Sequence, residues 1–224
     1  MKPIPLTKPI AIACALALSV SLAVAIPAAQ AHQGYGAADA APAAATKAPQ
    51  LHAAMRSLWH GHIEATRAYA MAVKAADTAG AKKAADDVVA NARQIANAVG
   101  GFYGPAAGTQ MLKLLSGHWS GVKSLADADH ANDSAAHAKA MHELTGNATA
   151  IAKFLSGANP NLSDATVRGL MMMHVADHET HIRAIMQGDT QAEASTWTEM
   201  QTHMNTIADA LADGIAKQFP AKAK

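Results

Sequence analysis

The hydrophobic residues of this chain recur every three or four positions over most of its length, which is the period of an amphipathic α-helix. The stripe that contains Met55, Trp59 and Tyr69 is a clear example, and similar stripes follow it along the chain. No alternating pattern typical of a β-strand competes with them. The residue types that dominate, such as Ala, Leu, Met, Lys and Gln, also favour helix. The sequence therefore predicts an all-α protein.

Glycine, proline and capping residues divide this pattern into about six helices. Gly80 is expected to end the first helix, and turns at 100–105 and 157–161 separate later ones. Ser163 is a favourable N-cap for the fifth helix, which Gly188 ends. The expected helices are 51–80, 81–99, 105–128, 132–155, 164–187 and 191–218. Short connections between helices of this length favour an up-and-down helical bundle, in which successive helices are antiparallel.

The start of the chain, 1–31, is expected to be a secretory signal peptide. Lys2 and Lys8 precede an apolar run at 10–26, and a small-x-small cleavage site lies at 29–31. A membrane anchor is the weaker interpretation, because the run is short for a membrane span. This pattern predicts export, so the protein is expected to be periplasmic or secreted.

Residues 32–50 are rich in Ala and Pro without a helical period, which is typical of a flexible tether. The folded domain is therefore expected at 51–220, and it contains no further stretch apolar enough to span a membrane. Cys14, the only cysteine, lies within the signal peptide, so the exported domain has neither a disulfide nor a thiolate ligand. The formal net charge of +1 and the aromatic content of 4% give no indication of nucleic-acid binding.

Four histidines occupy positions where the helical stripes would place a hydrophobic residue: His62, His118, His174 and His203. Each lies near the midpoint of a different expected helix. Since antiparallel neighbours of similar length share a midpoint, the four rings are expected at one level of the bundle, together with Asn91. A buried polar group without a partner costs about 1–3 kcal/mol. The rings must therefore be satisfied by each other, by water or by a metal ion.

A transition-metal ion is the leading interpretation of this layer. Imidazole with an occasional carboxylate suits zinc, copper, nickel or iron. Glu199 lies one turn before His203 and is expected to be a fifth ligand or to orient that ring. The proposed ligands are His62, His118, His174, His203 and Glu199.

The helix that carries His174 has further candidate ligands. His178 and His181 lie on the same face, and three methionines at 171–173 lead directly into His174. Thioether with imidazole is a ligand set for copper(I), whereas methionine at helical spacing usually fills a hydrophobic core. Both interpretations stay open for these residues.

Two other functions compete with metal binding. The first is a metal-free cell-envelope protein for interaction or stress, in which hydrogen bonds within the histidine layer fix the helix register. The second is a redox metalloenzyme, which needs an open coordination position and a pocket that reaches solvent. The paired Glu-x-x-His motifs of di-iron bundles, the His-Glu-x-x-His motif and the phosphate-binding glycine loop are absent from the sequence. Binding, buffering or sensing of a metal is therefore favoured over turnover.

Several motifs are dispersed in order over residues 51–220. They are Leu58-Trp59-x-x-His62-x-x-x-Thr66-Arg67, Phe102-Tyr103-Gly104-x-x-Ala107-Gly108, Ala158-Asn159-Pro160-Asn161, Glu199-x-x-x-His203 and Gly214-Ile215-x-Lys217-Gln218-Phe219-Pro220. Together with His118 they resemble a family of small, exported bacterial helical proteins known mainly from bacilli, which has no established function.

The resemblance implies that the family's histidines match His62, His118, His174 and His203, and that its glutamate matches Glu199. The chain departs from the family at two positions, His178 and His181, where other members carry Thr and Glu. Members are often labelled glycosyltransferase or acetylglutamate kinase, and no residue of this chain supports either activity. The resemblance therefore supplies no chemistry, and the interpretation of the site depends on the residues themselves.

Overall fold

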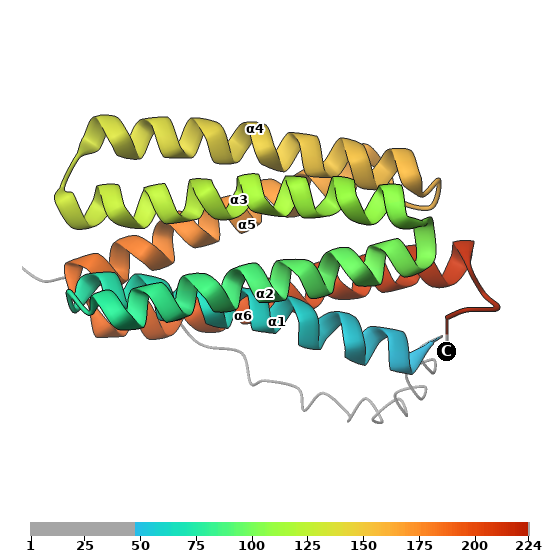
Figure 1. The fold of residues 1–224 in the computed structure, drawn as a ribbon, viewed down its shortest axis with the longest axis horizontal. Helices are drawn as coiled ribbons and strands as arrows, with labels where there is room; N and C mark the ends of the chain where they lie inside the picture. The colour runs from blue at the N-terminus through green and yellow to red at the C-terminus, as the bar shows by residue number, and fades with distance from the viewer. Residues whose placement is uncertain (1–47, 224) are drawn as a thin grey trace, which may run out of the picture. The chain divides into compact units, whose positions relative to one another are not determined.

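The computed structural model describes residues 48–223, which form a bundle of six α-helices (Figure 1). The helices are α1 (Pro49–Lys74), α2 (Thr78–Tyr103), α3 (Pro105–Ala131), α4 (Ser134–Ala158), α5 (Asp164–Gln187) and α6 (Thr190–Gln218). This described part of the chain has no strand, so the all-α up-and-down bundle expected from the sequence is confirmed. The expected signal peptide and nearly all of the expected tether lie outside the described residues. Within 48–223, no helix is long and apolar enough to cross a membrane.

The connection between α1 and α2 differs from the expected one. Helix α1 ends at Lys74 rather than at Gly80, and α2 already begins at Thr78. Ala76 adopts a left-handed backbone with a φ of 55°, and the side chain of Asp77 then accepts a hydrogen bond from the Gly80 backbone N–H. The break between the helices is therefore made by an aspartate N-cap. Glycine at position 80 leaves room for this cap, because a Cβ there would overlap with the carboxylate.

The bundle consists of three helical hairpins that repeat at a constant interval along the sequence. Each hairpin (α1–α2, α3–α4 and α5–α6) turns through a residue with positive φ that is followed by an aspartate N-cap. The caps are the equally spaced Asp77, Asp133 and Asp189. Two residues that are as far apart in the sequence as two successive caps therefore occupy equivalent places in their hairpins.

A polar contact inside each hairpin follows the same repeat. A side chain from the second helix bonds to the backbone carbonyl of a leucine in the first helix, 33 residues earlier. The pairs are Asn91 with Leu58 at 2.9 Å, Asn147 with Leu114 at 3.0 Å and His203 with Leu170 at 3.0 Å. His203 is therefore the counterpart of two asparagines, and it has a different place in the repeat from the other histidines of the hydrophobic stripes.

The first helices of the three hairpins contact one another along a central axis. These are α1, α3 and α5, which run parallel because each is followed by an antiparallel partner. Helix α2 packs between α1 and α3, α4 packs between α3 and α5, and α6 packs between α5 and α1. Side chains at equivalent positions of α1, α3 and α5 therefore face one another at the same level of the bundle.

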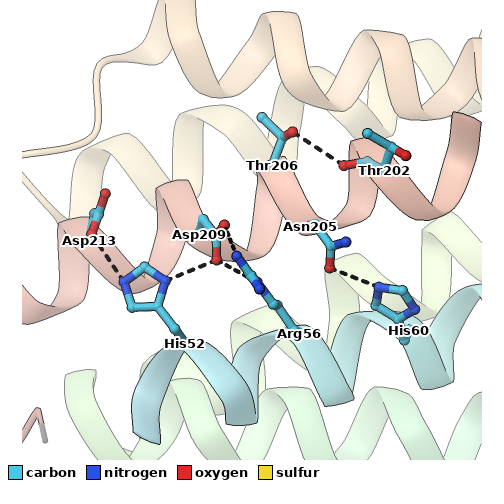
Figure 2. Close-up of polar contacts among 8 residues, drawn as sticks. All are labelled: His52, Arg56, His60, Thr202, Asn205, Thr206, Asp209 and Asp213. Carbon is cyan, nitrogen blue, oxygen red and sulfur yellow. Dashed lines mark hydrogen bonds and ion pairs between the residues drawn. The ribbon is translucent and has the colours of Figure 1, made fainter. Parts of the chain in front are cut away.

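The ring of helices closes where α6 meets α1, and polar side chains join these two helices (Figure 2). The ring of His52 lies between two carboxylates of α6, with Nδ1 2.9 Å from Asp209 and Nε2 3.1 Å from Asp213. Arg56 donates two hydrogen bonds to the same Asp209. These contacts hold the first helix of the chain against the last.

Candidate metal centre

Three histidines occupy equivalent positions of the repeat: His62 in α1, His118 in α3 and His174 in α5. The hydrophobic stripe of each helix turns these positions towards the interior. Because α1, α3 and α5 share the central axis, the three rings meet there. His178, one helical turn after His174, adds a fourth ring from α5.

The four rings form a compact and buried cluster. The centroids of the six ring pairs are 4.4–5.9 Å apart. Each ring offers one nitrogen, and these nitrogens all lie within 4.8 Å of one another. The four residues are only 1–4% exposed, and the Nε2 atoms of His174 and His178 are 3.1 Å apart. The structure therefore brings four buried histidines close enough to bind one metal ion.

Several ring nitrogens of this cluster lack a hydrogen-bond partner. Among residues 48–223, neither Nδ1 nor Nε2 of His118 has one, and the same holds for Nε2 of His62 and Nδ1 of His174. The buried indole N–H of Trp59, whose ring stands edge-on to His62 at 6.2 Å, also lacks an acceptor within that range. Unpartnered polar groups are rare in protein interiors, and each costs about 1–3 kcal/mol. The donor set thus fits a metal ion, which would bind the free lone pairs.

Burial keeps the four rings in the neutral form that binds a metal. Burial and, to a smaller extent, the neighbouring His118 lower the pKa of His62 from 6.5 to about 3. Burial also lowers the pKa of His118 to about 4, while the nearby amide of Asn147, whose oxygen does not reach hydrogen-bonding geometry with the ring, acts in the opposite direction. Burial and the surrounding rings hold the pKa values of His174 and His178 well below 6.5. Their lone pairs are therefore available at neutral pH.

Two residues of the expected ligand set, His203 and Glu199, lie outside the cluster. His178, not His203, is the fourth ring of the cluster. His203 instead bonds to the Leu170 carbonyl across the seam between α5 and α6. In the first two hairpins, Gly61 and Gly117 lie against the corresponding asparagines, with a would-be Cβ only 3.0 Å from the amide nitrogen. The third hairpin has the larger Met173 at that place, and the longer imidazole side chain still reaches the carbonyl.

The other two residues expected near the site also lie away from the cluster. Glu199 is exposed on α6 and accepts a hydrogen bond from Ser195 at 3.1 Å. Asn91 on α2 donates to the Leu58 carbonyl. Both belong to outer helices, as does His203. A position near the middle of a helix therefore does not by itself bring a side chain to the central axis.

A second group of polar side chains continues from the cluster towards the surface. His181, one turn after His178, lies 3.0 Å from Glu193, and Arg67 donates to the same carboxylate oxygen at 2.7 Å. The Trp197 ring stacks on His181 and on the Arg67 guanidinium. The hydrogen bond from Arg67 holds the pKa of Glu193 below its usual value. No spacing in the sequence indicates Glu193, because its role depends on the contact between α5 and α6.

The repeat is the signal that could have separated the histidines. His62, His118 and His174 follow one another at equal intervals, whereas His203 follows His174 after only about half that interval. The same spacing identifies Asn91 and Asn147 as the counterparts of His203. The role of His178 is harder to find, since the corresponding positions of the first two hairpins carry threonine and valine.

Comparisons with known proteins leave this assignment to the geometry alone. No family model, no curated protein and no solved structure matches the chain. The resemblance to the family known from bacilli therefore stays a prediction.

Proposed function

We propose that this protein binds one transition-metal ion through His62, His118, His174 and His178, and that it serves to bind, buffer or sense that ion. The observation that carries the proposal is the convergence of four buried rings, several of whose nitrogens have no hydrogen-bond partner among residues 48–223. Imidazole nitrogens are good ligands for zinc, copper, nickel and iron. Ligands at about 2.0–2.1 Å from a tetrahedral ion are about 3.3–3.4 Å apart. Small side-chain rotations would bring the four nitrogens to that spacing.

The burial of the cluster favours holding an ion over turning over a substrate. A catalytic metal keeps a coordination position open to solvent or substrate, whereas these four residues are only 1–4% exposed. A bound ion would accept lone pairs from α1, α3 and α5 together. It would therefore join the three inner helices and stabilise the fold.

We also propose that the protein works outside the cytoplasm, in the periplasm or beyond the cell. The support is the sequence pattern at 1–31, with two lysines, an apolar run and a small-x-small site. The lack of cysteine after position 14 leaves imidazole nitrogen and methionine sulfur as the nitrogen and sulfur ligands available in the exported chain.

The metal content of the purified full-length protein tests the proposal. Each cluster histidine is replaced in turn by leucine, which keeps the volume of the side chain, and elemental analysis gives the number of ions per chain. The matched control is His142→Leu, because His142 is exposed on α4. We expect one ion in the wild type and in the control, and none in the four variants. Unchanged metal content in all four variants would refute the proposal.

A metal-free structural layer is the second candidate. The observation in its favour is the 3.1 Å contact between Nε2 of His174 and Nε2 of His178, in which one ring donates to the other. A layer of this kind would fix the register of the helices by hydrogen bonding. It predicts that salts of copper, zinc, nickel and iron leave the melting temperature of the protein unchanged.

A further inference from the structure

The placement of the four rings restricts the coordination geometry that the cluster can offer. Three rings come from three helices around one axis, and His178 lies one turn further along α5 than His174, about 6 Å along the helix. The ring planes are inclined to one another by 22–89°. Copper(II) and nickel(II) prefer four donors in a plane. This arrangement instead suits ions that accept trigonal or tetrahedral ligand sets, among them zinc(II), copper(I) and silver(I).

The charge of the surroundings restricts the ion further, because no anionic side chain of residues 48–223 contacts the cluster. The candidate group contains no carboxylate, and within residues 48–223 no hydrogen bond joins one of its rings to a carboxylate. Glu193, which lies beyond His181, is already paired with Arg67. Asp177 on α5 interacts with His203 and Glu199 on the side of α6. An ion in the cluster would therefore keep its full charge in the protein interior.

The cost of burying an uncompensated ion grows with the square of its charge. A divalent ion would therefore cost about four times as much as a monovalent ion of similar size. Zinc(II) in such a site would have to bring an anion with it, and four rings that are only 1–4% exposed leave little room for one. Geometry thus disfavours copper(II) and nickel(II), and charge disfavours zinc(II).

We infer that the ion held by this cluster is monovalent, with copper(I) as the cellular ion and silver(I) as its redox-inert counterpart. The inference rests on the proposed function, since it names the ion for the same site. It adds that four neutral imidazoles without a carboxylate select an ion by its low charge.

Metal titrations of the full-length, metal-free protein test this inference. Silver nitrate and zinc sulfate are titrated separately and followed by calorimetry, and native mass spectrometry gives the number of ions bound. Copper(I) is supplied under anaerobic conditions in competition with the chelator bathocuproine disulfonate, and copper(II) is titrated in air. We expect one silver(I) or copper(I) per chain, and an affinity for zinc(II) and copper(II) at least about 100-fold weaker.

Two variants distinguish the cluster from methionine thioethers elsewhere, which also bind silver(I). His118→Leu should lose the tight monovalent site, and the exposed His142→Leu should keep it. Silver(I) binding by His118→Leu that is as tight as that of the wild type would overturn the inference. Zinc(II) or copper(II) binding at the cluster as tightly as silver(I) would overturn the inference and leave the proposed function intact. If no ion binds at the cluster, both fail.

Discussion

Replacing His118 with leucine should stabilise the metal-free protein while it abolishes the response to metal. Both ring nitrogens of His118 are buried without a hydrogen-bond partner in the described part of the chain. Leucine has a similar volume and suits the hydrophobic stripe of α3. Removing two unpartnered polar groups gains about 1–3 kcal/mol for each, and imperfect packing costs about 1–3 kcal/mol. We expect a net increase of about 2 kcal/mol in the free energy of unfolding.

Urea and thermal unfolding, followed by circular dichroism, measure this change with and without metal. In the presence of a chelator, a gain of about 2 kcal/mol corresponds to a rise in Tm of about 4–8 °C for a domain of this size. With silver(I) at about 1,000 times its Kd, the wild type gains about 4 kcal/mol, while the variant gains nothing. The order of stability should therefore reverse when the ion is added.

The control for this experiment is His142→Leu, which changes an exposed histidine. Its free energy of unfolding should stay within about 0.5 kcal/mol of the wild type in both conditions. If His118→Leu is clearly less stable than the wild type in chelator, the nitrogens of His118 are already satisfied in the metal-free protein. That result would refute the reasoning and support the structural histidine layer.

Three further predictions follow from the fold and the cluster. Stability should be full above about pH 6.5 and fall steeply below it. The unfolded chain binds protons there, whereas the four rings of the folded protein stay neutral, with pKa values of about 3 for His62 and about 4 for His118. The free energy of unfolding should fall by up to about 5 kcal/mol per pH unit when all four rings contribute. A free energy of unfolding that stays constant between assay pH values of 7 and 4.5 would contradict this prediction. Gly108→Ala should destabilise the protein by about 1–3 kcal/mol, since a Cβ there lies 2.9 Å from the Ala96 carbonyl oxygen. The matched Gly146→Ala, where no described atom lies within 4 Å, should instead stabilise it by up to about 1 kcal/mol in the same urea assay. Replacing a hairpin N-cap by alanine should lower the free energy of unfolding by about 1 kcal/mol. The three caps are Asp77, Asp133 and Asp189, and widely different losses at them would argue against equivalent turns.

The sequence predicts the helices well because their hydrophobic period is local. The boundary between α1 and α2 is misplaced because Gly80 looks like a helix end, whereas it accommodates the carboxylate of the Asp77 cap. The period cannot distinguish inner helices from outer ones, since both bury one stripe. His203 and His118 therefore look alike in sequence, although one bonds to a carbonyl at a helix seam and the other faces the axis.

The departure of the third hairpin from the repeat decides what kind of site the cluster forms. The counterparts of His178 are Thr66 and Val122, which are both buried. The hydroxyl of Thr66 already donates to the Ile63 carbonyl at 2.9 Å, and Val122 has no polar atom in its side chain. Two hairpins therefore offer nothing more to an ion, and a strict repeat would give three ligands with an open fourth position, as in catalytic zinc sites. His178 supplies that fourth ligand from within the protein, so the proposed site is closed and suited to holding an ion.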